Sequence, residues 1–251
     1  MKLIIRLAAT SAVATWATAG MAFFDGEVFY GSKTSNVKYT TAGTEKTKAL
    51  KGTEMGATFL LDPIPLIPVA FGVTVSQGTT DLKDVAQLAA DDNATRGDTA
   101  GFSATGTGTS KTMFYGPVIK VWVPMPKIQP YLKAGYLMGT EVEDQSYTYS
   151  SPAGSAFAAS IVDKPKLAYT HTATEITAGI GFSPVKLTSI FAEYSMHSGK
   201  RKVKSLSGEV DMDVGGNTSS GAYATSDLSD DQKKAKTSDS KSIRFGVSAG
   251  I

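Results

Sequence analysis

Eight short segments of this chain alternate between apolar and polar residues at every second position. In the last segment, KSIRFGVSAGI, the residues Ile243, Phe245 and Val247 fall on one side of an extended strand, and Arg244 and Gly246 fall on the other. About ten alternating residues are the sequence pattern of a strand in a membrane-spanning barrel. The eight segments are Phe24–Gly31, Glu54–Leu61, Val69–Ser76, Met113–Val123, Ile128–Gly139, Glu175–Phe182, Ser189–Met196 and Lys241–Ile251.

The connections between these segments alternate in length. Three are short and contain proline, which ends strand pairing: Asp62–Pro68, Pro124–Lys127 and Ser183–Lys186. Four are long and rich in Gly, Ser, Thr, Asp and Lys, and we expect them to be loops: Thr34–Lys51, Thr79–Lys111, Glu141–Lys166 and Ser198–Ser240. Short turns at one rim and long loops at the other are typical of outer-membrane barrels.

The second long connection contains one candidate helix. In Asp81–Ala90, the residues Leu82, Val85 and Leu88 fall on one side at helical spacing. The pattern fits a short helix over the mouth of the barrel, and it fits a disordered segment equally well.

The composition of the polar rows indicates which face points inward. A soluble barrel of the lipocalin type would place the apolar rows inside. Glycine on an exposed strand face packs against nothing, whereas near the axis of a narrow barrel it leaves room for larger neighbours. We therefore expect Phe71, Tyr136 and Phe245 to face lipid, and Lys133 and Gly135 to face the axis. The glycines of the polar rows are Gly31, Gly56, Gly72, Gly116, Gly135, Gly139, Gly179, Gly181, Gly246 and Gly250.

The start of the chain, Met1–Ala22, has the pattern of a cleavable secretory signal, with Lys2 and Arg6 before an apolar stretch. Its removal leaves residues 23–251, with 25 − 2 = 23 basic and 23 acidic residues. A neutral chain gives no reason to expect nucleic-acid binding. The absence of cysteine excludes disulfides and thiolate metal sites. No later apolar run approaches the roughly 20 residues of a membrane helix.

The stretches QPYLKAGYLMG (Gln129–Gly139), TAGIGFSP (Thr177–Pro184), IFAEYS (Ile190–Ser195) and SIRFGVSAGI resemble the small outer-membrane barrels of the OmpA/OmpX and opacity types. The resemblance implies an eight-stranded antiparallel up-and-down transmembrane β-barrel. It also implies export through the periplasm of a Gram-negative-type cell and insertion by the barrel-insertion machinery. Members typically end on an aromatic residue, and Ile251 takes that place here. The family includes adhesins, anchors and a few enzymes, so the resemblance does not fix the function.

Seven charged residues fall on the rows that should face the lumen: Glu27, Glu54, Lys120, Lys133, Glu175, Glu193 and Arg244. A buried charge is costly unless it is paired. From strand order we expect Lys133 beside Glu175, and Arg244 beside Glu193 and Glu27. One interpretation is a plug of ion pairs that seals the barrel, and the other is a set of hydrated side chains without a defined network.

Three bulky aromatic residues also fall on these inward rows: Phe114, Trp122 and Tyr131. An eight-stranded barrel has an interior just wide enough for side chains. We therefore do not expect a general diffusion pore.

Basic residues gather just above the outward end of the seventh segment: Lys200, Arg201, Lys202 and Lys204. They could contact phosphates of lipopolysaccharide by charge-assisted hydrogen bonds, or they could form a solvated loop.

The chain has only two histidines, His171 and His197. Neither is followed two residues later by a serine, and no acidic partner is evident from the spacing, so we do not expect an enzyme. No cofactor or metal site is expected either.

Taken together, these patterns predict a monomeric outer-membrane anchor whose surface loops serve recognition, adhesion or envelope structure through an unknown extracellular ligand. The alternatives are a narrow channel for small solutes and, more distantly, a lipid A-modifying enzyme.

Overall fold

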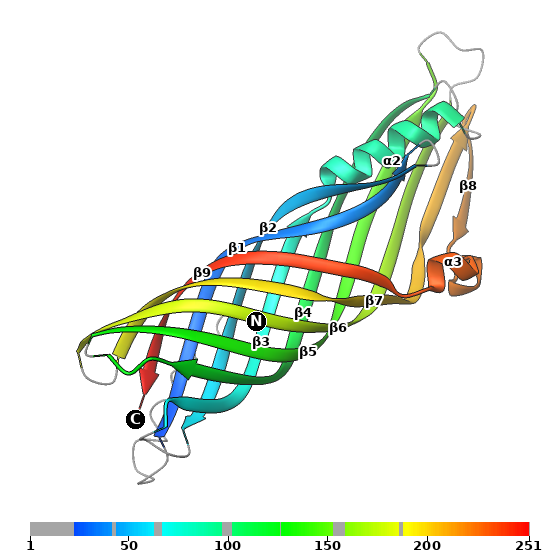
Figure 1. Ribbon diagram of the computed structural model, residues 1–251. Coiled ribbons are helices and arrows are strands. Elements are labelled where there is room, and N and C mark those ends of the chain that lie inside the picture. Colours follow the sequence, from blue (N-terminus) through cyan, green and yellow to red (C-terminus); the bar gives the residue numbers. More distant parts are fainter. Residues whose placement is uncertain are drawn as a thin grey trace.

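The computed structural model describes residues 23–41, 44–62, 67–96, 102–125, 127–152, 159–185 and 188–250. The expected signal segment, residues 1–22, and Ile251 lie outside these ranges. Eight long antiparallel strands form a closed ring, which confirms the predicted barrel (Figure 1). The order around the ring is β1, β2, β3, β4, β5, β6, β7 and β9, and β9 pairs back with β1.

Most strands of the ring are much longer than the roughly 9–11 residues that cross a bilayer. They range from 13 residues in β3 to 27 in β6 and β7. Their bounds are β1 Phe23–Thr41, β2 Thr44–Asp62, β3 Val69–Asp81, β4 Ser103–Trp122, β5 Ile128–Ser150, β6 Ala159–Val185, β7 Thr188–Val214 and β9 Lys236–Gly250.

The first and last strands close the barrel. Their antiparallel register runs from Asp25 opposite Gly250 to Asn36 opposite Asp239. Because every strand in the ring has a hydrogen-bonded neighbour on both sides, no open sheet edge faces lipid at this level.

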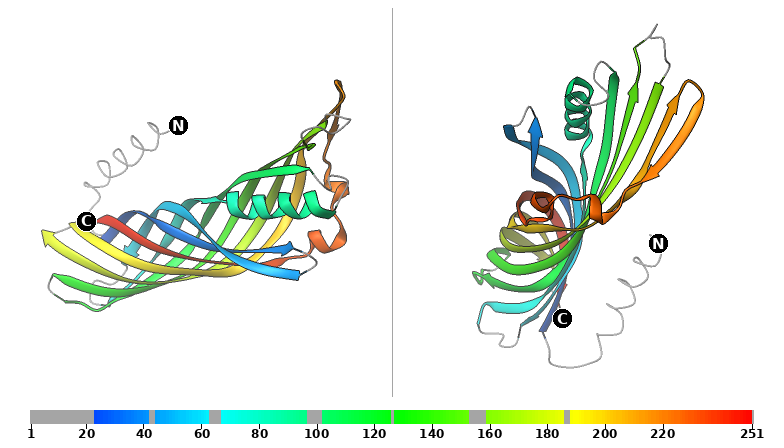
Figure 2. Two further views of the ribbon diagram at one scale, coloured as in Figure 1. Left: turned by 90° about the horizontal axis from the view of Figure 1, so that it is seen from above. Right: turned by 90° about the vertical axis from the view of Figure 1, so that its right-hand side faces the viewer.

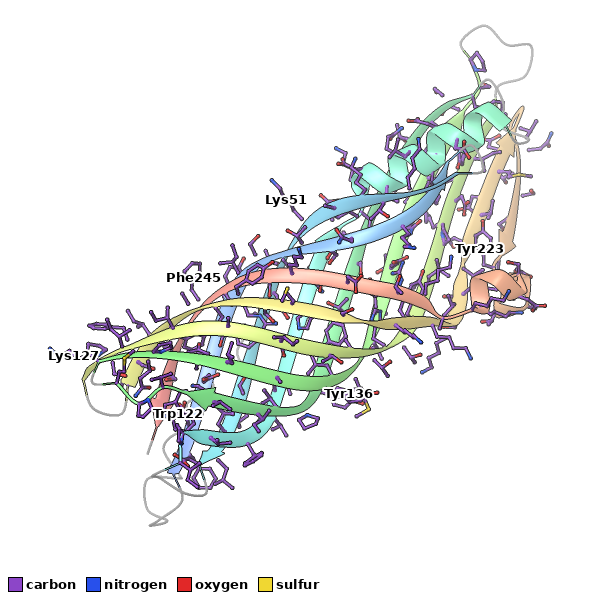
Figure 3. All side chains as sticks on the ribbon, viewed as in Figure 1. Lys51, Trp122, Lys127, Tyr136, Tyr223 and Phe245 are labelled. Atoms are coloured by element: carbon purple, nitrogen blue, oxygen red, sulfur yellow. The ribbon has the colours of Figure 1, made fainter. Side chains whose placement is uncertain are left out.

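Exposed apolar side chains form a band around all eight strands, which we call the apolar belt. Tyr136 and Phe71 are each 53% exposed, and Phe245 is 62% exposed. Tyr136 and Phe245 point away from the barrel (Figure 3), whereas Lys133 and Gly135 are buried inside it. The predicted orientation is confirmed, and the belt marks the part of the barrel that spans a membrane. The belt lies in residues 28–30, 55–61, 71–75, 113–123, 128–138, 176–182, 190–196 and 243–247.

The four long connections are not loops along most of their length, so that prediction was wrong. Strands continue through most of Thr34–Lys51, Glu141–Lys166 and Ser198–Ser240, and β4 occupies the Ser103–Lys111 part of Thr79–Lys111. These strand extensions stand above the apolar belt, where water rather than lipid covers the outer face and no outward apolar row is needed. Their polar composition therefore looked like that of loops.

The barrel wall is taller on one side than on the other. Strands β4 to β7 rise well above the pairing of β3, which ends at Asp81, and of β9, which begins at Lys236 (Figures 1 and 2). The tall side ends in a hairpin between β7 and β8 (Asn217–Ala222). Its two turn residues, Gly215 and Gly216, have φ of 61° and 84°, the geometry of a type I′ turn.

A helix fills part of the space behind the tall wall. Helix α2 (Lys83–Arg96) follows β3, as the helical interpretation of the sequence predicted, but extends further than expected. Ala86 and Ala90 are buried against Tyr147 and Tyr149 of β5, so α2 covers the lumen-facing side of the wall (Figure 2). A 3-10 helix, η1 (Thr225–Asp227), and a short helix, α3 (Asp230–Lys233), connect β8 to β9. Within the described ranges, no helix is long and apolar enough to cross a membrane.

Candidate functional site in the charged lumen and outer vestibule

The lower lumen contains a network of ion pairs at the level of the apolar belt. Lys133 contacts the carboxylates of both Glu27 and Glu193. Lys120 Nζ lies 2.6 Å from Glu27 Oε1, and the Tyr131 hydroxyl donates a 2.8 Å hydrogen bond to Glu193 Oε1. The five side chains come from β1, β4, β5 and β7, so the network joins strands across the barrel interior.

Arg244 of β9 is the centre of a second network just above the first. Its Nε and Nη2 atoms bind the two oxygens of Glu54 at 3.1 and 3.0 Å, and its Nη1 lies 2.5 Å from Glu175 Oε1. The guanidinium carbon lies 4.5 Å from the centre of the Phe29 ring. Ser195 donates a further 2.8 Å hydrogen bond to Glu175. Arg244 therefore joins β2, β6 and β9 through the lumen.

All seven charged residues named from the sequence lie inside the barrel in these two networks. Their pairing differs from the prediction. Of the expected pairs, Arg244 and Glu193 approach at 3.9 Å, but Lys133 pairs with Glu27 rather than Glu175, and Arg244 pairs with Glu54 and Glu175 rather than Glu27. In so narrow a barrel a long side chain reaches across the axis, so neighbouring strands are not its only partners.

Aromatic rings pack beside these charges, and glycines make room for them. Phe29, Tyr131 and Phe191 form a buried cluster. A Cβ atom added to Gly179 would lie 2.3 Å from the Tyr131 ring, and one added to Gly246 would lie 2.4 Å from the Phe191 ring. At Gly179 and Gly246 the structure thus confirms the role that the sequence indicated for inward glycines. Phe29 and Phe191 were not anticipated as lumen residues.

A third network, missed at the sequence level, lies above the belt. Arg201 Nη1 lies 2.5 Å from Glu143 and 3.1 Å from Glu141, and His171 Nε2 lies 2.7 Å from Glu141. The Tyr169 hydroxyl donates a 2.9 Å hydrogen bond to Glu143, and burial raises the pKa of Tyr169. The sequence did contain a signal for these carboxylates. Glu141 and Glu143 follow Lys133 at every second position, so they continue the inward-facing row of β5.

The alternation of side-chain direction along β7 also separates the four basic residues that were predicted to contact lipopolysaccharide. Lys200, Lys202 and Lys204 are exposed on the outer face of β7. Arg201 points to the opposite face and belongs to the lumen network. The grouping of Arg201 with the three lysines was therefore wrong, because alternate residues of one strand face opposite sides.

The histidines do not form a nucleophile and base pair with Ser198. His197 lies inside the barrel, with Nδ1 at 3.3 Å from Ser240 Oγ, whereas Ser198 is exposed on the outside and donates to Asp239 at 2.8 Å. In the part of the chain that the structure describes, no group of three or more His, Asp or Glu side chains is arranged to hold a metal ion.

A cavity of about 270 Å³ lies in the upper lumen, and we call it the vestibule. Its walls come from β1, α2, β4, β5, β6, β7 and the segment 228–240. The third network lies on one side of it, and Lys33 of β1 lines it as well. The vestibule therefore lies within the tall part of the barrel and has both apolar and charged side chains in its lining.

Comparison with solved structures finds several membrane barrels of similar extent. Neisserial surface protein A is 10% identical, with 90% of this chain and 96% of that chain covered and a TM-score of 0.36. Ail, the attachment invasion locus protein of Yersinia pestis, is 13% identical, with 90% and 98% covered and a TM-score of 0.34. CarO of Acinetobacter baumannii is 14% identical, with 86% and 96% covered and a TM-score of 0.35. No model of a protein family and no curated protein matches the chain.

Proposed function

We propose that this protein is a monomeric outer-membrane anchor, closed at the level of the bilayer, that presents its tall wall and vestibule to the outside of a Gram-negative-type cell. The observation that carries the proposal is the pair of ion networks around Lys133 and Arg244, which fill the lumen inside the apolar belt. A barrel filled in this way anchors a surface without offering an open path for solutes.

Outer-membrane location is the setting that best fits the two ends of the barrel. Bacterial barrels of this membrane have short periplasmic turns and longer external extensions, and the strands here extend far on one side only. The expected signal, Met1–Ala22, would direct export, and insertion would require the barrel-insertion machinery.

Recognition at the cell surface is the role that the upper structure supports. The wall formed by β4 to β8 is polar on its outer side and stands above the belt. It offers a surface for an extracellular ligand or for other envelope components. No enzymatic role is proposed, because His197 and Ser198 face opposite sides of the wall.

Lipopolysaccharide is the proposed lipid partner, now through three lysines rather than four basic residues. Lys200, Lys202 and Lys204 are exposed on β7 above Met196, an exposed apolar residue of the belt. This level matches the phosphates of the outer leaflet, which lysine binds as a point charge.

Replacing the three lysines Lys200, Lys202 and Lys204 with alanine should reduce the lipopolysaccharide that co-purifies with the barrel, measured as lipid phosphate per protein. Lys164→Ala is a matched control, because Lys164 is exposed much higher on the wall and pairs with Glu209 at 2.9 Å. Unchanged co-purification in the triple variant would remove this partner from the proposal.

The closed lumen is tested by planar-bilayer recording of the purified full-length mature protein, with a known open porin as the positive control. We expect no steady conductance steps. Steady open steps would contradict the anchor and favour the narrow channel instead. Protease treatment of whole cells should cleave the upper wall, and complete protection of it in intact cells would contradict the proposed orientation.

A further inference from the structure

Among the residues that the structure describes, Lys33 is the one cation of the upper lumen that has no carboxylate partner in the three ion-pair networks. Its side chain is 3% exposed, and its Nζ donates a single 3.1 Å hydrogen bond to Thr112 Oγ1. No described carboxylate lies within 4.0 Å of Nζ, because Glu54 is bound by Arg244, and Glu141 by Arg201 and His171. An ammonium group has three donors, so two N–H groups lack a protein acceptor.

The chain around Lys33 is built to hold it in this position. A Cβ atom added to Gly78 would lie 3.2 Å from Lys33 Nζ, so the glycine leaves space for the ammonium group. On another side, the centre of the Phe114 ring lies 5.6 Å from Nζ. Such a contact is weakly attractive to a cation but supplies no acceptor oxygen. The ammonium group is therefore fixed in place but incompletely satisfied.

The vestibule is the cavity that adjoins this buried group. Lys33 lines the vestibule together with five aromatic or imidazole rings, those of Phe114, Tyr147, Tyr169, His171 and His197. The two carboxylates in the lining, Glu141 and Glu143, are both bound by Arg201, and neither lies within ion-pair distance of Lys33. A buried cation without a carboxylate partner favours an anion over a cation in this cavity.

We propose that the vestibule is a binding site for a small organic anion, whose carboxylate or phosphate accepts hydrogen bonds from Lys33. The cavity of about 270 Å³ lies near the lower limit of small-molecule pockets, which is about 300 Å³. The ligand is therefore a small solute or a single charged group of a larger molecule. Use of the site by the cell rests on the proposed function, because the vestibule must face the outside.

Calorimetric titration of the purified full-length mature protein in detergent micelles tests the site directly. The probes are benzoate, inorganic phosphate and benzamide, the uncharged counterpart of benzoate. We expect at least one of the two anions to bind, with benzamide at least about tenfold weaker than benzoate if benzoate binds. Binding of benzamide as tight as that of benzoate, or no binding of either anion, would overturn the proposal.

A matched pair of variants assigns the binding to Lys33. Lys33→Met keeps an unbranched side chain but removes the charge, and should weaken anion binding by about tenfold to a hundredfold, as expected for a lost hydrogen bond to a charged group. Lys51→Met is the control, because Lys51 points outward from β2 (Figure 3). Equal affinity of Lys33→Met and wild type would overturn the assignment.

A footprint on the wild-type protein covers the case in which Lys33→Met does not fold. Amine acetylation, read by mass spectrometry, should be slowed by the bound anion at Lys33 and unchanged at Lys51. Equal slowing at both positions, or at neither, would count against the site.

Two further comparisons identify the source of the anion and test the site independently of the proposed function. Lipopolysaccharide added to the micelles competes with the bound anion if its phosphates are the natural ligand, and leaves it bound if the ligand is a free solute. Binding in micelles does not depend on membrane orientation or conductance. A protein that conducts but still binds anions would therefore overturn the closed anchor and leave the site intact.

Discussion

Replacement of Arg244 by methionine is the sharpest test of the lumen networks. The guanidinium makes three hydrogen bonds to carboxylates, two to Glu54 and one to Glu175, and is 3% exposed. Each hydrogen bond to a charged group contributes about 1.5–3 kcal/mol, which gives a gross loss of about 4.5–9 kcal/mol. The carboxylates left without a partner can bind protons or water, which reduces this loss. We therefore expect the free energy of unfolding to fall by about 3–5 kcal/mol, the value for breaking a buried ion pair.

The assay is urea-induced unfolding of the barrel in lipid vesicles, with the fraction folded read from heat-modifiable migration on a gel. Lys241→Met is the matched control, because Lys241 is on the same strand but exposed to the outside, and it should change the free energy of unfolding by less than about 0.5 kcal/mol. A triple variant with Arg244→Met, Glu54→Gln and Glu175→Gln should recover much of the loss, because no charge is then stranded.

The reasoning would be refuted if Arg244→Met matched wild type within about 0.5 kcal/mol. It would also be refuted if the triple variant were as unstable as the single one, because the loss would then come from packing around Phe29 rather than from unpaired charge.

Three further changes have expected outcomes. Gly179→Val should destabilise the barrel by about 1–3 kcal/mol in urea unfolding, because its Cβ would lie 2.3 Å from the Tyr131 ring. Gly216→Val should destabilise the β7–β8 hairpin by about 1–2 kcal/mol, because φ is +84° there, and limited proteolysis should cut that hairpin faster. Lys48→Met removes a 2.9 Å ion pair with Asp84 of α2, but this pair is exposed to water, so the loss should stay below about 1 kcal/mol.

Each of these changes has a control or a contradicting result. Gly221→Ala should be neutral, because nothing lies within 4 Å of the added Cβ, and equal losses for Gly221→Ala and Gly179→Val would contradict the packing argument. An unchanged proteolysis rate would contradict the turn assignment. A loss above about 2 kcal/mol in Lys48→Met would mean that this pair is not screened as its exposure indicates.

The barrel and its orientation could be predicted from the sequence because a membrane imposes two simple patterns. Residues that face lipid must be apolar at every second position, as Phe245 and Val247 are, and the narrow interior demands small residues such as Gly246 beside large ones such as Phe191. Both patterns are local, so they can be read without knowing which strands pair.

The upper barrel could not be predicted in the same way, because above the membrane the apolar half of the pattern disappears. Glu141 and Glu143 continue the inward row of Lys133, and Arg201 continues the inward row of Glu193. Their alternate positions on the strands could be read from the sequence, but the polar composition of these segments is typical of loops, so we did not extend the strands through them. Extending each inward row upward by parity would have separated Arg201 from its lysine neighbours.

The ion-pair partners needed three-dimensional information. Arg244 pairs with Glu54, which lies 190 residues away in the sequence, across β1 from β9. The height of each side chain along the barrel axis depends on the shear of the barrel, which is the stagger between neighbouring strands. This shear cannot be read from the sequence. The incomplete satisfaction of Lys33 is a further consequence of these distant pairings.

The claim that apolar rows face lipid while the inner rows close the lumen is tested most directly by single-cysteine labelling, since the natural chain has no cysteine. Tyr136→Cys and Ser195→Cys, on the outer and inner faces of the wall, would each be treated in vesicles with a water-soluble maleimide and with a lipid-soluble one. We expect Tyr136→Cys to react only with the lipid-soluble reagent, and Ser195→Cys to react with neither until the barrel is unfolded. Rapid reaction of Ser195→Cys with the water-soluble reagent, or protection of Tyr136→Cys from the lipid-soluble one, would contradict it.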